Sequence, residues 1–467
     1  MRTAPRFTRL IVSFTLSLLT PFLVAAEPEF WLTDPDGSAR FEKQAEGLAF
    51  QKRVPSGSEI VVDAGTTYQT IDGFGYTLTG GSAMHLAKMS DDRRMALLKE
   101  LFATDGTNIG VSYLRLSIGA SDLSDKVYSY DDIAPGQTDY EMKLFDLGPD
   151  RDHVIPVLQQ ILKIAPDIKI MGSPWSPPTW MKTNASSIGG SLKPECYDAY
   201  AKYFVRYIQE MAKEKIRIDA ITVQNEPLHP GNNPSLLMQA AEQAEFIKNH
   251  LGPSFQEARI DTKIVVYDHN CDRPDYPITI LDDLMARKYV DGSAFHLYRG
   301  KISAMSTVHE AHPDKKLYFT EQWVGAPGNL QGDLAWHIRE LVVGATRNWS
   351  RTVLEWNLAA DPSHLPHTPG GCTRCLGAVT IDGDKVTRNP AYYVIAHASK
   401  AVRPGSVRIA TNLLEGLPNV AFKTPDNRMV LIVLNDGPST RTFQIRVKAK
   451  VATATLPARA VGTYVWP

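Results

Sequence analysis

Cysteine is scarce in this chain, which has four among 467 residues. Cys372 and Cys375 have the spacing of half a zinc site or of a redox pair, but no second pair accompanies them and no thioredoxin-like pattern surrounds them. We therefore expect either a local disulfide or two free thiols in a loop. Cys196 and Cys271 either pair or lie buried and reduced, and the sequence leaves both alternatives open.

The chain also lacks a block of one charge. Its 50 basic and 51 acidic residues are interspersed, so nucleic acid is not an expected partner. Long apolar runs are missing too, because Leu10–Val24 is shorter than the ~20 residues of a spanning helix. This run follows three arginines and precedes Val24-Ala25-Ala26, so residues 1–26 are predicted to be a cleaved signal peptide. We expect a secreted or periplasmic protein without stable membrane insertion; an uncleaved anchor is the alternative.

A glycine-rich phosphate turn is missing as well. Gly73-Phe74-Gly75 is too degenerate to count as one, which argues against a doubly wound nucleotide-binding sheet. Residues 66–400 instead alternate short apolar runs with helical periods, as parallel strands covered on both faces do. The strand candidates are Thr70–Phe74, Ser112–Ser117, Ile168–Gly172, Ala220–Gln224, Lys263–Tyr267, Ser293–His296, Leu317–Thr320 and Thr352–Trp356. These eight repeats predict an α/β fold, a (β/α)8 TIM barrel.

Helical periods separate several of these strands. The predicted helices are Ser82–Phe102, Tyr197–Glu214, Ser235–His250 and Gly332–Thr346. The largely aromatic stripe on Tyr197–Glu214 is expected to pack onto the barrel rather than to form a binding surface.

The pattern changes after Lys400. Short β-like runs, most of them separated by turn residues, predict an all-β sandwich over residues 401–467. Leu48–Val54 and Glu59–Val62 are also β-like, so residues 27–65 are expected to join that sandwich. The predicted domains are thus a signal peptide (1–26), N-terminal strands of the sandwich (27–65), a catalytic barrel (66–400) and the C-terminal sandwich (401–467).

Two lone glutamates end predicted barrel strands. Glu226 follows Val223-Gln224-Asn225, and Glu321 follows Tyr318-Phe319-Thr320. Because reacting groups of TIM barrels lie at the carboxyl ends of the strands, both carboxylates are predicted to face one cleft. Such a pair can cleave a glycosidic bond, with one group protonating the departing oxygen and the other attacking the sugar.

Other polar and aromatic residues end neighbouring strands. We expect Arg115 and Tyr298 to hold Glu321 ionised as the nucleophile, and burial beside Glu321 to raise the pKa of the acid, Glu226. Asn225 is expected to donate to the sugar 2-hydroxyl. The remaining predicted substrate-binding residues are Asp122, which would accept hydroxyl hydrogens, and Trp175, His296 and Trp356. Glu355 also ends a strand, and a structural ion pair accounts for it equally well.

The joint order of these motifs resembles glycoside hydrolase family 30, which contains lysosomal glucosylceramidase and microbial β-glycosidases. The shared motifs include Leu114-Arg115-Leu116, Ser173-Pro174-Trp175, Asn225-Glu226-Pro227, His296-Leu297-Tyr298, Glu321 and Trp356-Asn357-Leu358-Ala359. The resemblance implies Glu226 as acid/base, Glu321 as nucleophile, retention of configuration, and no metal or organic cofactor. It also implies that the seven other residues named above line the sugar subsite.

The chain departs from the glucosylceramidase pattern after the first strand, where Thr79-Gly80-Gly81-Ser82 replaces an acidic setting. The expected substrate is a β-glucoside, either a glycoconjugate such as glucosylceramide, which implies sphingolipid metabolism, or a β-1,6-glucan. The departure keeps a β-fucosidase or β-xylosidase open. A non-catalytic carbohydrate-binding protein on the same barrel is the alternative of another class. Oligomeric state and endo or exo action are not predicted.

Overall fold

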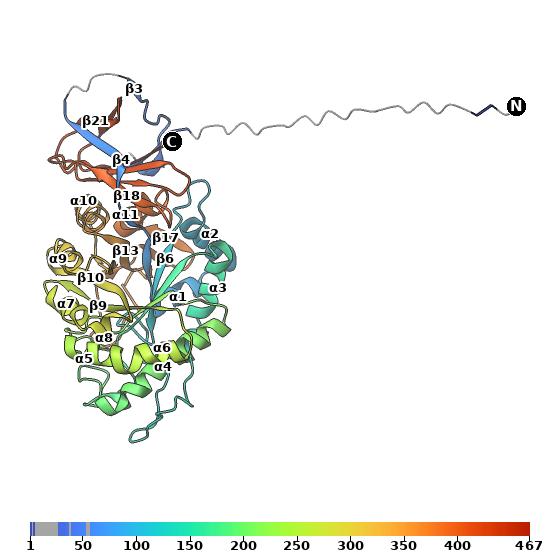
Figure 1. The fold of residues 1–467 in the computed structure, drawn as a ribbon, viewed down its shortest axis with the longest axis vertical. Coiled ribbons are helices and arrows are strands. Elements are labelled where there is room, and N and C mark those ends of the chain that lie inside the picture. The colour runs from blue at the N-terminus through green and yellow to red at the C-terminus, as the bar shows by residue number, and fades with distance from the viewer. Residues whose placement is uncertain (2, 5–26, 37–38, 53–56) are drawn as a thin grey trace.

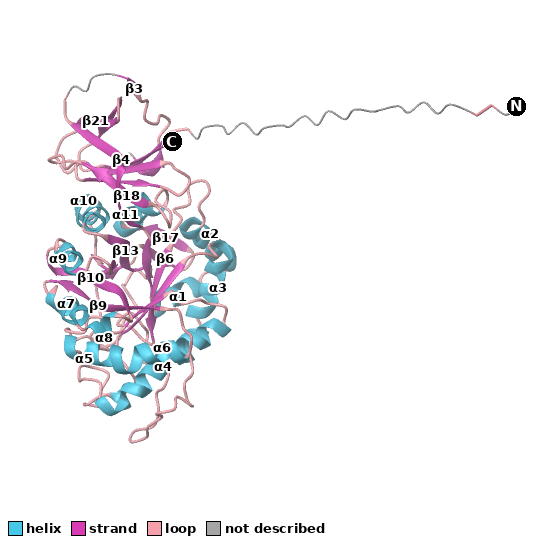
Figure 2. Ribbon diagram, in the orientation of Figure 1, coloured by secondary structure: helices cyan, strands magenta, loops and turns pink. Residues whose placement is uncertain are grey.

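The computed structural model describes residues 1, 3–4, 27–36, 39–52 and 57–467. Most of the predicted signal peptide, residues 2 and 5–26, therefore lies outside the described residues. The chain forms a barrel surrounded by helices, with a layer of strands beyond one end of it (Figures 1 and 2). No helix in the described ranges is both long and apolar enough to cross a membrane.

The barrel confirms the predicted (β/α)8 fold. Eight parallel strands close in the order β10-β11-β13-β5-β6-β7-β8-β9. Their bounds are β5 Gly73–Leu78, β6 Tyr113–Ile118, β7 Lys169–Pro174, β8 Ala220–Thr222, β9 Lys263–Cys271, β10 Val290–Gly300, β11 Lys316–Glu321 and β13 Ser350–Asn357. The first strand begins later than predicted, because the residues up to Thr70 continue a strand of the other sheet, where Thr70 pairs with Val407.

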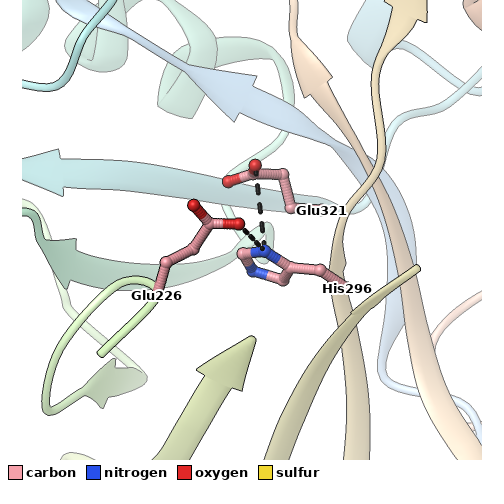
Figure 3. A group of neighbouring side chains, drawn as sticks. All are labelled: Glu226, His296 and Glu321. Atoms are coloured by element: carbon pink, nitrogen blue, oxygen red, sulfur yellow. Dashed lines mark hydrogen bonds and ion pairs between the residues drawn. The ribbon is translucent and has the colours of Figure 1, made fainter. Parts of the chain in front are cut away.

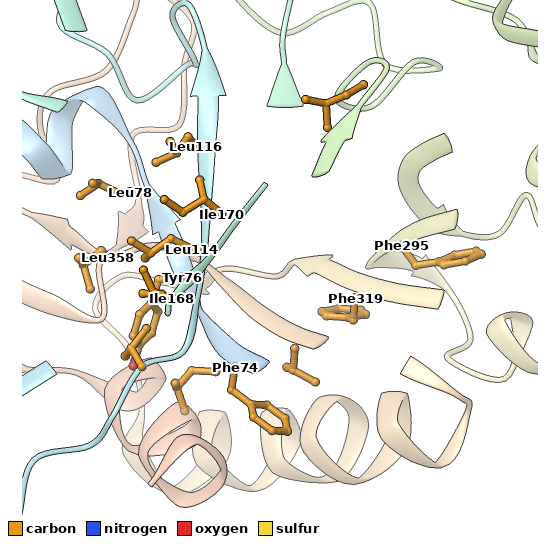
Figure 4. Packing of buried hydrophobic residues seen from close by; sticks show 14 of the residues in the cluster. Phe74, Tyr76, Leu78, Leu114, Leu116, Ile168, Ile170, Phe295, Phe319 and Leu358 are labelled. Carbon is orange, nitrogen blue, oxygen red and sulfur yellow. The ribbon is translucent and has the colours of Figure 1, made fainter. Parts of the chain in front are cut away.

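Alternation along the strands separates two faces of the barrel wall. Leu114 and Leu116 of β6 belong to the large apolar cluster between the strands and the helices (Figure 4). Arg115 lies between them and therefore points into the barrel, where it is fully buried. Seven strands each add one side chain to a separate interior cluster: Tyr113, Met171, Ala220, Val265, Ala294, Tyr318 and Leu354. This layer fills the barrel, so only its mouth is available to a ligand.

The helices cover the barrel. They are α1 Gly80–Lys88, α2 Asp91–Phe102, α3 Val154–Ile164, α4 Tyr197–Lys213, α5 Ala240–Phe246, α6 Gly252–Glu257, α7 Asp275–Asp282, α8 Leu284–Arg287, α9 Ala304–Ala311, α10 Leu330–His337 and α11 Pro390–Ser399. Two π-helical segments, η4 Ile247–Leu251 and η5 Ile338–Ala345, and three 3-10 turns, η1 Gly148–Arg151, η2 Thr179–Met181 and η3 Pro194–Cys196, complete the set.

The predicted helical ranges do contain helices, but the breaks within them were not predicted. The predicted Ser82–Phe102 is two helices, because Met89 and Ser90 adopt extended backbone angles between α1 and α2. The aromatic stripe of α4 is buried, as predicted, and it packs on neighbouring helices and the barrel.

The β-sandwich is formed by a ten-stranded sheet. Its strand pairs are antiparallel except for β4 and β21, which are parallel. Its order is β2-β1-β23-β20-β19-β18-β4-β21-β22-β3, and its own apolar cluster fills the interior. The strands are β1 Glu29–Asp34, β2 Ala39–Lys43, β3 Gln51–Lys52, β4 Glu59–Thr70, β18 Val407–Thr411, β19 Asn419–Lys423, β20 Met429–Leu434, β21 Arg441–Val447, β22 Lys450–Leu456 and β23 Val461–Trp466.

The sandwich thus contains strands from both ends of the chain. β3 and β4 lie where Leu48–Val54 and Glu59–Val62 were predicted, and residues 53–54 lie outside the described residues. β1 and β2 were not predicted. The exact domain bounds stay predictions. Five short strands belong to loops around the barrel: β12 Val324–Gly325, β14 Ala359–Ala360, β15 Cys375–Leu376, β16 Val379–Asp382 and β17 Lys385–Arg388.

A buried histidine joins the two parts. His397 of α11 lies between two sandwich strands, with Nδ1 2.9 Å from Thr463 Oγ1 and Nε2 2.8 Å from Thr33 Oγ1. The Thr463 hydroxyl already donates to the His397 carbonyl at 2.9 Å, so Nδ1–H donates to Thr463 and Nε2 accepts from Thr33. The ring is therefore neutral, and burial lowers its pKa to about 3.

This histidine makes the stability of the protein pH-dependent. The unfolded chain binds a proton at His397 below about pH 6.5, whereas the folded chain does not until about pH 3. We predict that His397 lowers the free energy of unfolding by about 1.4 kcal/mol per pH unit as the pH falls through this window. In His397→Leu this slope should be absent. Urea unfolding of both proteins at pH 7, 6 and 5 measures the difference, and parallel curves would contradict the assignment.

Candidate active site

A cavity of about 560 Å³ opens at the carboxyl ends of the barrel strands. Its lining includes Asp122, Trp175, Asn225, Glu226, Tyr298, Glu321 and Trp356, seven of the nine predicted site residues. The other two, Arg115 and His296, are fully buried directly beneath it. The structure therefore brings all nine together, although they come from distant parts of the chain.

The two glutamates face one another across the cavity floor (Figure 3). One oxygen of Glu226, one oxygen of Glu321 and a ring nitrogen of His296 all lie within 4.8 Å of one another. Glu226 adopts the left-handed backbone region (φ 46°), and its N–H donates to the Asp268 carbonyl at 3.0 Å. This unusual conformation for a side chain of its size is maintained by the surrounding strands and sets the direction of the carboxylate.

Glu321 is held by two donors. Arg115 Nη1 lies 2.7 Å from Glu321 Oε2, and the Tyr298 hydroxyl lies 2.9 Å from Oε1. Both contacts were predicted from the sequence. Each oxygen of the carboxylate is thereby fixed by a separate hydrogen bond, which leaves little freedom for rotation.

Beneath this pair lies a residue that the sequence analysis missed, Asp268. It is inaccessible to solvent and belongs to β9. The groups within hydrogen-bond distance of its carboxylate are Arg115 Nη2 (2.7 Å), His296 Nε2 (3.1 Å), Ser173 Oγ (2.5 Å), Thr222 Oγ1 (2.7 Å) and Thr320 Oγ1 (2.6 Å). The same search for polar residues after apolar runs would have found it directly after Val266-Tyr267.

Charges pair closely in this buried cluster. Burial by itself raises the pKa of Asp268, but Arg115 and His296 outweigh it and hold that pKa well below its usual range. Burial lowers the pKa of His296, but the carboxylates of Glu321, Asp268 and Glu226 reverse this effect and raise the pKa to about 9. His296 is therefore protonated near neutral pH.

The protonated ring changes the expected proton positions. His296 Nδ1 lies 3.1 Å from Glu226 and 3.8 Å from Glu321. Burial raises the pKa of Glu226, but the hydrogen bond and charge of His296 outweigh it, so the pKa is lowered rather than raised as predicted. Burial, supported by the charges of Glu226 and Asp268, raises the pKa of Glu321 in spite of His296 and Arg115. In the free site the proton nearest to Glu226 thus lies on His296.

The rest of the lining divides into polar groups and rings. Asn225 Oδ1 accepts from Arg115 at 2.7 Å, which leaves its amide N–H groups as donors. Trp175 and Trp356 have ring centroids 5.4 Å apart, and the Arg115 guanidinium lies 4.9 Å from the Trp175 ring. Burial and the charge of Glu321 raise the pKa of Asp122 to about 7.

Three alternatives from the sequence are settled by contacts. Glu355 lies 2.7 Å from His337 Nδ1 and is absent from the cavity lining, so it is a structural residue. Cys372 and Cys375 form a disulfide, while Cys196 and Cys271 are buried free thiols.

His269 lines the cavity and was not predicted; its Nε2 lies 3.9 Å from Glu226 Oε1.

One group in the described part of the chain has the donor set of a metal site: Glu226, His296 and Glu321. A metal would have to displace the proton of His296 and lie beside the Arg115 guanidinium, so the residues present fit a metal poorly. The expectation that no metal or organic cofactor is used stays a prediction.

A closed parallel barrel whose mouth presents two facing carboxylates between aromatic rings defines a class, the glycoside hydrolases. Comparison of the sequence with models of known protein families identifies the family. The family model described as the glycosyl hydrolase family 30 TIM-barrel domain matches residues 71–402, and the one for the family 30 beta sandwich domain matches residues 405–464. The chain therefore belongs to glycosyl hydrolase family 30, which confirms the predicted resemblance.

Relatives match along almost the whole chain. An endo-1,6-beta-D-glucanase of Neurospora crassa is 34% identical over 457 residues, with 93% of each chain covered. The lysosomal acid glucosylceramidase of Mus musculus is 29% identical, with 90% of this chain and 85% of the relative covered. A solved endo-beta1,6-glucanase superposes with a TM-score of 0.88 at 34% identity, covering 94% of this chain and 99% of its own.

The buried carboxylate beneath the site should be essential. In Asp268→Asn, Arg115 and His296 lose their shared counter-charge, and we predict a loss of about 3–5 kcal/mol in the free energy of unfolding. Activity on an aryl β-glycoside should fall roughly 100-fold, because both groups orient the reacting carboxylates. Denaturant unfolding and steady-state kinetics measure the two effects.

The matched control is Asp72→Asn, which breaks a partly exposed pair with Arg351 on the barrel wall away from the cavity. It should cost only about 1 kcal/mol and leave activity unchanged. Equal losses for the two variants would contradict a special role of Asp268.

Proposed function

We propose that this protein is an exported retaining β-glycosidase that hydrolyses β-1,6-linked glucan. The observation that carries the proposal is the pair Glu226 and Glu321, one oxygen of each within 4.8 Å of the other, at the floor of the cavity. Retaining glycosidases place their carboxyl groups ~5–5.5 Å apart, whereas inverting ones need ~6.5–9.5 Å for an intervening water. The short separation supports double displacement.

Glu321 is the nucleophile in this proposal. Its two oxygens are fixed by Arg115 and Tyr298, so one of them can be aimed at the anomeric carbon. As the bond between the sugar and the departing oxygen breaks, a bond forms between the anomeric carbon and Glu321. The positive charge of Arg115 stabilises the carboxylate before the attack and the leaving carboxylate in the second step.

Glu226 is the acid and then the base. It passes a proton to the departing oxygen. In the free site this proton lies on His296, 3.1 Å away, from which Glu226 receives it. A bound sugar that expels water favours the neutral carboxyl and raises the pKa of Glu226 from its lowered value in the free site, so that the proton moves to Glu226 from His296. In the second step Glu226 removes a proton from the attacking water, which releases the sugar with its original configuration.

The sugar itself has donors and walls in the cavity. In this proposal the Asn225 amide donates to the 2-hydroxyl, and Asp122 accepts from a sugar hydroxyl. The Trp175 indole N–H is buried and has no protein partner among the described residues. Trp175 and Trp356 provide the apolar faces.

The leaving-group end favours a polar substrate. The cavity lining continues over His229, Asn232, Asp272, Arg273 and Arg299, with the half-buried apolar side chains of Leu228 and Trp323 beside them. Hydroxyls of a further glucose unit suit such a surface better than the acyl chains of a ceramide. The relatives at 34% identity, whose names state endo-1,6-β-glucanase activity, favour the same substrate.

The glycine pair that kept other sugars open does not line the cavity. A Cβ on Gly81 would lie 2.7 Å from the Leu123 carbonyl, so this segment packs tightly against its neighbours. The glycine pair therefore gives no reason to favour a β-fucoside or a β-xyloside over a β-glucoside. Export rests on the predicted signal peptide of residues 1–26.

Chemical rescue tests the roles of the two glutamates. In Glu321→Ala, turnover should fall by about 10⁴-fold or more, because no group remains to form the covalent intermediate. Added azide should restore part of it and yield a glycosyl azide of inverted configuration. In Glu226→Ala, azide should instead yield the azide of retained configuration. Product configuration is read by NMR, and Glu355→Gln is the control that should remain active. An inverted product from Glu226→Ala would exchange the two roles.

A substrate panel tests the specificity. We predict that kcat/KM for a linear β-1,6-glucan exceeds that for glucosylceramide in detergent by at least about 100-fold, since each unmet polar group at the leaving-group end costs about 1–3 kcal/mol. Aryl β-glucoside, β-xyloside and β-fucoside complete the panel. Binding of the glucan without any turnover would instead support the carbohydrate-binding alternative.

A further inference from the structure

A disulfide forms part of the wall of the cavity. Cys372 and Cys375 lie in the loop that follows β13, and both line the cavity. They pack in one small cluster with Trp175 and Trp356, the rings assigned to the sugar. The proposed mechanism gives the disulfide no role, although the disulfide lies in the cavity wall beside these rings.

The same loop holds Asp122 by its side chain and by its backbone. The Cys372 N–H lies 3.3 Å from Asp122 Oδ2, and the Thr368 N–H donates to the Asp122 carbonyl at 2.9 Å. Gly371 permits this approach, because a Cβ there would lie 2.5 Å from the Asp122 carbonyl oxygen. The loop therefore fits closely around one residue of the sugar pocket.

The Cys375 end of the disulfide is fixed by other contacts. β15, which begins at Cys375, pairs with β12, directly after the strand that carries Glu321. Asn357 Nδ2 lies 3.4 Å from the Cys375 carbonyl. The disulfide thus links Cys375, which is anchored to the barrel, to Cys372, whose backbone N–H donates to Asp122.

We propose that the Cys372–Cys375 disulfide is a positioning element of the sugar pocket, which holds the Cys372 N–H on Asp122 and thereby fixes this carboxylate for a sugar hydroxyl. The inference rests on the proposed function, because Asp122 needs a fixed position only if it binds the substrate. It deepens that function by assigning a role in substrate affinity to a loop outside the reacting pair.

The electrostatic setting of Asp122 gives this contact a measurable consequence. Burial and the charges of Glu321 and Glu226 together raise the pKa of Asp122 to about 7, although the hydrogen bond from the Cys372 N–H acts in the opposite direction. Tyr298 faces the same group and interacts with its charge. If the Cys372 N–H moves away, the pKa of Asp122 rises, and a smaller fraction of the protein has an ionised Asp122 near neutral pH.

Reduction of the folded protein tests the inference. A dithiol gives two electrons and two protons to the disulfide; the S–S bond breaks, two cysteine thiols form, and the reagent becomes a cyclic disulfide. Cys196 and Cys271 are already free, so this bond is the only target among the four cysteines. Thiol titration under denaturing conditions should rise from two groups to four and confirms completeness.

We expect KM for the β-1,6-glucan to rise roughly tenfold on reduction, with kcat changed less than about twofold, since a contact that binds substrate and transition state equally affects KM. The acidic limb of the kcat/KM profile should move to higher pH. In an Asp122→Asn background, reduction should produce neither effect. A merely structural disulfide would lower stability and leave the pH profile in place.

The double variant Cys372→Ser/Cys375→Ser is the matched control, because it should reproduce the reduced protein and respond to no reductant. Full reduction with KM and pH profile unchanged overturns the inference while leaving the proposed function intact. If the oxidised protein cleaves no β-1,6-glucan, the proposed function fails. The crystal structure of the reduced protein then decides the inference: loss of the Cys372–Asp122 contact supports it, and an unchanged contact overturns it.

Discussion

The buried pair of Asp268 and Arg115 is the interaction on which the rest of the site depends. A carboxylate fully removed from water is costly unless charge and hydrogen bonds compensate it. Asp268 obtains this compensation from side chains on β6, β7, β8, β10 and β11, so six of the eight barrel strands meet at one group. The cost of burying it is recovered only when all of these strands are in register, which couples the formation of the site to closure of the barrel.

The same arrangement gives two chemically identical glutamates different surroundings. Arg115 extends from Asp268 to Glu321, and His296 extends from Asp268 to Glu226. One carboxylate therefore faces a guanidinium that never loses its proton, and the other faces an imidazolium that can. In the proposed mechanism the nucleophile, Glu321, thus lies beside a cation that stays charged, and the acid, Glu226, lies beside a ring that can pass a proton to it. The neighbours distinguish the two carboxylates, as in other carboxylate pairs with divergent environments.

The fold and the reacting groups could be predicted because they follow from local pattern. Runs that are apolar throughout indicate buried parallel strands, and a polar residue at the end of such a run must lie at the barrel mouth. Asp268 directly follows the predicted end of its strand at Tyr267, so its place near the barrel mouth could be predicted, but its full burial within β9 could not. Tyr267 and Asp268 both adopt positive φ angles at a bulge between β9 and β10, which turns the carboxylate inward. The sequence does not indicate this backbone at Tyr267, and the pairing of β9 with β10 reveals it.

The proton positions could not be predicted for a related reason. The sequence indicates that Glu226 and Glu321 are close, and closeness alone would raise the pKa of the acid. It does not indicate that His296 lies between them with Asp268 behind it, and that geometry reverses the shift at Glu226. The strand ends predict which residues belong to the cluster. Whether each pKa is raised or lowered depends on all the charges of the cluster together.

Position along the strands also explains why the loop is tethered. Glu321, His296 and Asp268 lie on barrel strands, so the hydrogen bonds of the sheet fix their backbones. Asp122 lies beyond the end of β6, where no ladder constrains it. A ligand group on a loop must be fixed by other means if it is to bind as precisely as groups on strands. The neighbouring loop provides this through Cys372, and the covalent link to Cys375 connects it back to the barrel.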